Sequence, residues 1–188
     1  IKQTPTYSMR TLTYHEATPG HHHQIAHSLE NESLTLYRRF GYGTSAFSEG
    51  WALYAEQLAL EAGLAENPYD ELGILQSEIF RAVRLVVDTG MHYKKWTREE
   101  AMKYMKSITG MSDTEVRVEI ERYIVWPGQA LSYKVGMLKM LELRDKAKNE
   151  LGDKFNIKDF HSAVLDHGNP PLFIVEEMVN KMIEEAKS

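Results

Sequence analysis

The sequence contains no cysteine among its 188 residues. Disulfide bonds and thiolate metal sites are therefore excluded, and a bound metal ion would have to be held by histidine, aspartate or glutamate side chains. The missing cysteines do not indicate a redox compartment, so the localisation stays unknown.

Positive charge is also scarce, because 22 lysines and arginines stand against 27 aspartates and glutamates, a formal net charge of −5. Without a basic excess the chain has no electrostatic means of capturing nucleic acid, and we expect no such partner. No stretch approaches the ~20 apolar residues of a membrane-spanning helix. The opening residues IKQTPTYSMR also lack the apolar centre of a signal peptide.

Linkers and repeats are absent as well, since no internal repeat, low-complexity tract or Pro/Gly/Ser-rich segment marks a second domain. The length suits one domain with a real core. The chain begins without Met, and its most reactive segment lies close to the first residue. We therefore expect residues 1–188 to be a single helical catalytic domain or a fragment of one, the C-terminal part of a longer helical protein. The missing N-terminal portion could supply part of the cleft.

Apolar periodicity predicts an all-α fold. The predicted helices are 47–62, 70 to about 90, 129 to about 149, and 170–187. Thr97 with Glu100, and Ser112 with Glu115, fit the capping box and predict two further helix starts. In the helix from residue 70 we expect a core-facing stripe made of Leu72, Leu75, Ile79, Val83, Val86 and Val87.

Histidines gather in residues 14–24, which read YHEATPGHHHQ. His-Glu followed by another His is how many metalloproteases present two zinc ligands and a general base, usually as HExxH on one helix face. Here the residue four after His15 is Pro19. On a straight helix His22 would regain the face of His15 but lie ~10 Å along the axis. Two ligands of one zinc are at most ~4 Å apart, so a zinc site here requires a break in the helix.

Pro19 and Gly20 supply a reason for the break. The proline ring clashes with the carbonyl group four residues earlier, that of His15, and proline lacks an amide donor. If Pro19 and Gly20 form a two-residue bulge, their removal restores the HExxH register with His21 as the second ligand. We therefore prefer His21 to His22.

An alternative is that Thr18 caps a new helix with Pro19 at its first position. This arrangement would leave His15 at the end of one element and His21 or His22 in the first turn of the next, with the metal at the break. We expect surface or supporting positions for the two histidines that follow, His23 and His27.

A third ligand is expected on the helix that begins near residue 48. Ser48 can cap this helix, which would place Glu49 in its first turn. Glu56 is the alternative, because it lies seven residues later and hence on the same face. A catalytic zinc would keep its fourth position for water.

Five blocks of the sequence together resemble the domain of unknown function 885 family of bacterial proteins, which is grouped with the zincin-like peptidases. They are YHEATPGHHHQ, FSEGWALYAEQL, RLVVDTGMHYKKWTREEAMKYM, YIVWPGQALSYKVG and FHSAVLDHGNPPLFIVEEMV. The segment EGWALYAE is also similar to the glutamate-bearing helix of gluzincin metallopeptidases. The resemblance covers nearly the whole chain, and these blocks lie toward the C-terminal end of the longer family members.

The resemblance implies a zinc-dependent peptidase with one zinc ion per chain and a peptide as substrate. His15, His21 and Glu49 would hold the zinc, and Glu16 would act as general base toward a metal-activated water that attacks the peptide carbonyl. We expect Tyr133 to stabilise the developing oxyanion, with a core tyrosine as the equally weighted alternative.

Further polar residues are candidates for substrate binding or for supporting the ligands. They are His22, Arg84, Asp88 and His92. Arg84 could clamp a substrate carboxylate and Asp88 could orient an imidazole, although an internal Arg84–Asp88 ion pair at i and i+4 is slightly favoured. His92 falls near the end of a predicted helix, where the helix dipole alone can account for it.

Two other functions remain open at this stage. The same zinc chemistry could act on non-peptide amides or esters, and a non-enzymatic helical module could bind metal adventitiously. Exo- versus endo-cleavage, substrate preference and oligomeric state are also left open.

Overall fold

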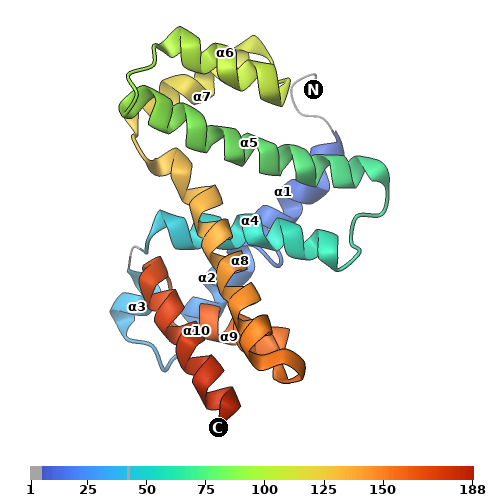
Figure 1. Cartoon of the computed structure of the whole chain (residues 1–188), viewed down its shortest axis with the longest axis vertical. Helices are drawn as coiled ribbons and strands as arrows, with labels where there is room; N and C mark the ends of the chain where they lie inside the picture. The colour runs from blue at the N-terminus through green and yellow to red at the C-terminus, as the bar shows by residue number, and fades with distance from the viewer. Residues whose placement is uncertain (1–5, 42) are drawn as a thin grey trace.

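The structure is a computed structural model that describes residues 6–41 and 43–188. Within these ranges there is no strand, so the all-α prediction is confirmed. The helices are α1 Met9–Glu16, α2 His21–Glu30, α3 Leu36–Phe40, α4 Ser45–Glu61, α5 Pro68–His92, α6 Arg98–Thr109, α7 Asp113–Val125, α8 Ser132–Leu151, α9 Ile157–Leu165 and α10 Leu172–Lys187 (Figure 1). Short 3-10 turns lie at Thr6–Ser8, Gln129–Leu131 and Gly152–Lys154.

The helices predicted from periodicity are confirmed as α4, α5, α8 and α10. Both capping boxes are present, at the starts of α6 and α7. Helix α8 begins three residues later than predicted, because Gln129–Leu131 forms a 3-10 turn. The predicted cap at Ser48 is wrong, since α4 begins at Ser45 after Thr44 and Glu49 lies one turn further into the helix. Helices α3 and α9 were not predicted.

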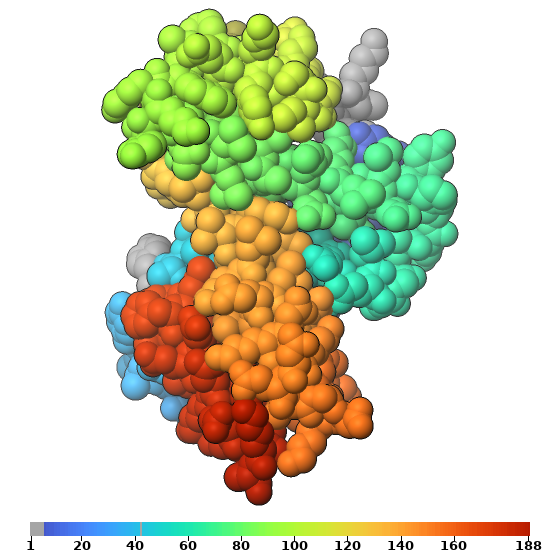
Figure 2. All heavy atoms as spheres, viewed as in Figure 1, coloured from blue at the N-terminus to red at the C-terminus, as the bar shows by residue number. Residues whose placement is uncertain are grey.

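Two hydrophobic clusters hold the helices together. One joins α4 and α8 to α9 and α10 and includes Trp51, Tyr54, Met140, Leu143, Phe160 and Val179. The other joins α5, α6 and α7 to the turn before α8 and includes Val83, Val87, Met105, Ile120 and Tyr123. Helix α8 runs from one group of helices to the other, and Figure 2 shows its orange surface beside the red α10.

Helix α4 lies at the centre of the fold and is buried on most of its circumference. Its most extensive contact is with α8, where the two backbones cross at Gly50 and Gly136. A methyl group on Gly136 would overlap the carbonyl oxygen of Ala46, and one on Gly50 would meet the Gly136 backbone. Only glycine therefore permits this close approach, which fixes the helix that carries the candidate ligand Glu49.

The predicted core-facing stripe of α5 is only partly correct. Val83 and Val87 are buried against α6 and α7, but four of its six members, Leu72, Leu75, Ile79 and Val86, are exposed. The first part of α5 packs instead through Gly73 and Ile74, on the side that meets α1 and the Thr6–Ser8 turn, so the exposed members of the stripe lie away from these contacts (Figure 1). No helix in the described ranges is long and apolar enough to cross a membrane.

The α4–α8 crossing predicts that Gly136→Ala destabilises the protein. Alanine is the better helix former by about 1 kcal/mol, but the overlap with Ala46 should dominate, and we expect a net loss of about 2 kcal/mol in the free energy of unfolding. Chemical denaturation measures this loss. Asn149→Ala, at an exposed position of the same helix, is the control and should change stability by less than about 0.5 kcal/mol. A Gly136→Ala protein of wild-type stability would contradict the crossing.

Candidate metal centre

The helix breaks between His15 and His21, as the metal hypothesis requires. Helix α1 ends at Glu16 and α2 begins at His21. The peptide bond before Pro19 is cis, and the chain turns back so tightly that a methyl group on Gly20 would overlap the carbonyl oxygen of His15. The prediction that a helix starts at Pro19 is wrong, because Gly20 precedes the first helical residue.

A side chain of α4 holds this break in place. Trp51 is buried and donates a hydrogen bond from Nε1 to the carbonyl oxygen of Pro19, at 2.8 Å. The segment between α1 and α2 is thereby tied to the helix that carries Glu49. The two histidines on either side of the break are held against the same helix.

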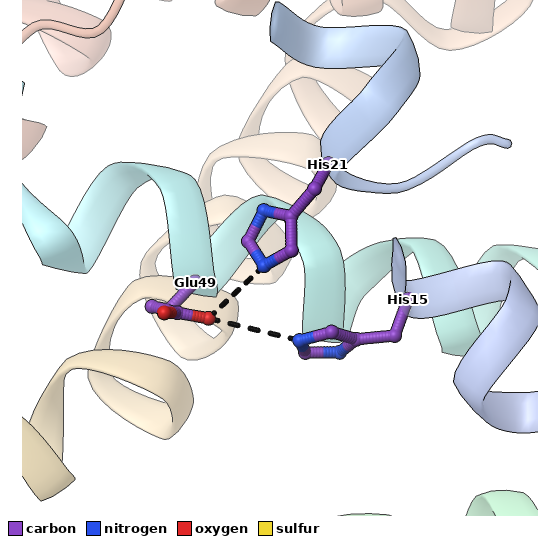
Figure 3. A group of neighbouring side chains, drawn as sticks. All are labelled: His15, His21 and Glu49. Carbon is purple, nitrogen blue, oxygen red and sulfur yellow. Dashed lines mark hydrogen bonds and ion pairs between the residues drawn. The ribbon is translucent and has the colours of Figure 1, made fainter. Parts of the chain in front are cut away.

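His15, His21 and Glu49 meet at one point, each contributed by a different helix (Figure 3). Glu49 Oε2 lies 3.2 Å from His21 Nε2 and 3.6 Å from His15 Nε2. All three potential ligand atoms lie within 4.8 Å of one another. Ligands at ~2.0–2.1 Å from a tetrahedral zinc are roughly 3.4 Å apart, so this donor set fits one ion.

Glu56 contacts the other ring nitrogen of His15. Its Oε1 atom lies 2.7 Å from His15 Nδ1, and both side chains are nearly inaccessible, with 4% of His15 and 2% of Glu56 exposed. When the neutral imidazole donates its Nδ1 proton to Glu56, the Nε2 lone pair faces Glu49 and His21. Glu56, the alternative third ligand, thus lies behind His15 instead of in the cluster. Glu49 and Glu56 lie on the same face of α4, as their seven-residue spacing indicates, and both contact His15.

The charged groups of the cluster shift one another's pKa. Burial by itself would raise the pKa of Glu49, but the imidazoles of His15 and His21 outweigh burial and hold this pKa at about 2. Burial lowers the pKa of His15, and the carboxylates of Glu49 and Glu56 reverse this effect and raise it above the ordinary value. The two shifts have one cause, the attraction between the imidazoles and the carboxylates.

The other histidines of the opening motif lie outside the cluster. His22 and His23 are exposed on α2. His27 pairs with Asp166 through Nε2, at 2.6 Å from Oδ1. The structure thus brings His21, and not His22, to His15 and Glu49.

Glu16 is the last residue of α1 and is exposed. Its carboxylate makes no hydrogen bond or ion pair with any residue that the structure describes. It follows His15 directly in the chain, but it is not a member of the group of three.

Tyr133 lies beside the cluster, in the first turn of α8. Its half-buried ring is stacked on that of His15, with centroids 6.2 Å apart and an interplanar angle of 18°. Its hydroxyl group makes no hydrogen bond within the described ranges. The Tyr133 hydroxyl therefore differs from that of a core tyrosine with a satisfied partner.

Arg84 and Asp88 are not paired with each other in the described part of the chain, so the predicted ion pair is wrong. Arg84 is 1% exposed, and its Nη2 donates to Gln129 Oε1 at 3.3 Å. Asp88 accepts a hydrogen bond from the backbone amide of Gly128 at 3.1 Å. The turn before α8 crosses α5 here, and its polar groups capture both side chains.

His92 also supports the fold around α7. It is the last residue of α5, and its Nε2 donates to the carbonyl oxygen of Tyr123 at 2.9 Å. Neither Asp88 nor His92 contacts the three clustered residues.

Similar proteins are known from one family and from solved structures. A family described as "Bacterial protein of unknown function (DUF885)" matches residues 1–179. The crystal structure of "the putative lipoprotein from Colwellia psychrerythraea" has a TM-score of 0.94 and 53% sequence identity over 98% of this chain. The structure of "a putative lipoprotein of unknown function from Shewanella oneidensis" has a TM-score of 0.86 and 28% identity over 93% of it. The chain spans 32% of the length of each of these two proteins. No curated protein matches it.

The cluster predicts an unusually acidic Glu49 in the metal-free protein. Its carboxyl group should titrate near pH 2, which carboxyl carbon NMR shifts against pH will measure. Because this pKa is lower than in the unfolded chain, ionised Glu49 stabilises the fold above about pH 4.5, and this stabilisation is lost as the pH falls toward 2.

Two variants test whether the imidazole of His21 contributes to the low pKa of Glu49. His21→Ala removes one imidazole while burial remains, so the pKa of Glu49 should rise. His22→Ala, the exposed neighbour, should leave it unchanged. A wild-type pKa at or above the ordinary glutamate value would contradict the arrangement.

Proposed function

The chain belongs to the DUF885 family of bacterial proteins, and we propose that it forms the zinc-binding part of a metallopeptidase. The observation that carries the proposal is the convergence of His15, His21 and Glu49 from three helices, with the second nitrogen of His15 fixed by Glu56. Because the chain spans 32% of each solved relative, the proposal concerns the full-length protein, and the experiments use that protein.

The donor set matches the chemistry of a catalytic zinc. Two imidazoles and one carboxylate are three protein ligands, which leaves the fourth position of a tetrahedral ion open. The side chains of His21 and Glu49 are 19% and 20% exposed, so a substrate can reach the open side. When bound, zinc supplies a Lewis acid that polarises a carbonyl group and lowers the pKa of a coordinated water toward ~7.

Glu16 is the proposed general base. Its carboxylate is exposed next to His15 and is not engaged by any of the described residues, so it is free to accept a proton from the attacking water. It then returns this proton to the leaving amine. A carboxylate already held in an ion pair would be a weaker base for this purpose.

Tyr133 is the proposed donor to the oxyanion. Its ring lies alongside His15, and the guanidinium carbon of Arg84 lies 4.1 Å from the ring centroid on which it packs. These contacts fix the ring and leave its hydroxyl group without a partner in the described ranges. A hydroxyl held in this way can donate to the negative charge that develops on the carbonyl oxygen.

Both solved relatives are described as putative lipoproteins. We extend this description to the present protein as part of the proposal, which would place its activity at a bacterial membrane surface. Peptides at such a surface would then be the substrates.

Metal content and activity test the proposal together. Full-length protein should contain about one zinc ion per chain by elemental analysis, and His15→Ala should lose it. Glu16→Gln should keep the zinc and lose at least ~10²-fold in kcat on peptides, because it retains the ligands but lacks the base. His22→Ala is the control and should keep both properties. Unchanged hydrolysis by Glu16→Gln would exclude Glu16 as the base. Cleavage of esters without any cleavage of peptides would contradict a peptidase.

Glu56 should control zinc affinity without binding the ion. Glu56→Gln keeps an acceptor for His15 Nδ1 but loses the negative charge, so zinc should bind roughly 10-fold to 100-fold more weakly. Competition with a chromogenic chelator measures this affinity. Glu16→Gln is the matched control, since it removes the same charge from an exposed site and should bind zinc like wild type. Equal affinities of Glu56→Gln and Glu16→Gln would remove the proposed role of Glu56.

A further inference from the structure

A cavity of about 580 Å³ lies beside the proposed zinc site. His15 and Glu56 form part of its wall, so the cavity adjoins the side of the cluster that faces α5. The rest of the wall comes from the Thr6–Ser8 turn, from α1 and α5, and from the end of α6 through the first turn of α7. Its volume is in the range of ordinary small-ligand sites.

The wall carries charges of both signs. Its two carboxylates have hydrogen-bond partners, since Glu56 Oε1 contacts His15 and Glu115 accepts hydrogen bonds from Ser112 at the start of α7. The guanidinium of Arg81 is the cation of this wall. Arg81 makes no hydrogen bond or ion pair with the described residues, and its Nε atom is buried without a partner.

Aromatic rings hold Arg81 in place where a carboxylate would usually do so. Its guanidinium carbon lies 4.7 Å from the ring centroid of Phe80 and 5.1 Å from that of Tyr133. The ring of Tyr133 is in turn 6.2 Å from that of His15. Arg81 is thus separated from the proposed zinc ligand by one aromatic ring.

A second guanidinium group packs on the same two rings, Phe80 and Tyr133. Arg84 lies one turn further along α5, is 1% exposed and has a buried Nε atom without a partner. Within the described ranges its Nη2 donates a hydrogen bond to the neutral side chain of Gln129. Glu119, a nearby carboxylate, is already bonded to Arg122 and Tyr123. Buried guanidinium groups without a counter-ion are costly, and an anionic ligand would offset this cost.

We propose that Arg81 binds the C-terminal carboxylate of the peptide substrate and that the protein removes single C-terminal residues. This inference rests on the proposed zinc peptidase. Arg81 and the proposed ligand His15 line the same cavity, so a peptide whose scissile bond lies at the zinc site can extend its C-terminal carboxylate toward the guanidinium group.

The wall also indicates which terminal residue the cavity accepts. Leu12, Phe80 and Met111 line it, so an apolar or aromatic C-terminal side chain is favoured. In the reaction the oxygen of water joins the acyl carbon as the C–N bond breaks. One proton passes to the leaving amine, and the products are a shortened peptide and a free amino acid.

Matched substrates test the inference in the full-length protein. One N-acetylated peptide ending in phenylalanine is offered as the free acid and as the C-terminal amide. Wild type should favour the acid by roughly 10²-fold in kcat/KM, since a charge-assisted bidentate contact is at stake. Arg81→Gln should lose this preference by slowing cleavage of the acid alone, and Arg81→Lys should restore part of it.

Arg117→Gln is the control, because Arg117 is exposed on α7 and should not affect the preference. Equal cleavage of acid and amide by wild type, or an equal loss on both substrates in Arg81→Gln, would overturn the inference. Preferential cleavage of peptides with a free N-terminus irrespective of the C-terminus would indicate recognition of the amine instead.

A binding measurement separates this inference from the zinc proposal. Calorimetric titration of zinc-free protein with N-acetylphenylalanine and with its amide needs no hydrolysis. The acid should bind at least 10-fold more tightly than the amide to wild type, and this difference should vanish in Arg81→Gln. Retained acid binding without any hydrolysis would refute the peptidase and leave the carboxylate site standing. Equal binding of acid and amide would refute the site itself.

Discussion

The arrangement of the site depends on the buried hydrogen bond between His15 and Glu56. At 2.7 Å and almost without solvent exposure, this contact sets the ring orientation of His15 and directs its second nitrogen to the point where His21 and Glu49 meet. A buried carboxylate without such a partner would be strongly destabilising. The same contact therefore both secures α1 against α4 and leaves Nε2 of His15 facing His21 and Glu49.

Helix α4 can act as this support because it is the most enclosed element of the fold. Its crossing with α8 at Gly50 and Gly136 leaves no room for movement, and Trp51 ties the break between α1 and α2 to it. Glu49 and Glu56 project from this helix to the two nitrogens of one imidazole. Rigid placement of ligands on a buried helix favours the precise geometry that a metal centre requires.

Local sequence signals predicted most of the helices and the break, and together with the family resemblance they predicted the group of His15, His21 and Glu49, but not the other contacts between distant elements. Periodicity and capping boxes identified most helices, and Pro19 with Gly20 indicated that the helix must end. The pairing of Arg84 with Asp88 failed because the turn before α8 supplies nearer partners for both. Glu56 contacts His15 because of the way α1 crosses α4. The spacing of residues within α4 does not predict this crossing. Periodicity predicts an apolar face of α5 without identifying which of its residues another helix covers.

The central claim is that His15, His21 and Glu49 bind one zinc ion. The most direct measurement is a crystal structure of the zinc-loaded, full-length protein with anomalous diffraction recorded at the zinc absorption edge. The account predicts a single strong peak within ~2.2 Å of His15 Nε2, His21 Nε2 and a carboxylate oxygen of Glu49. A zinc peak elsewhere, for example at His27 and Asp166, with none between these three residues, would contradict it.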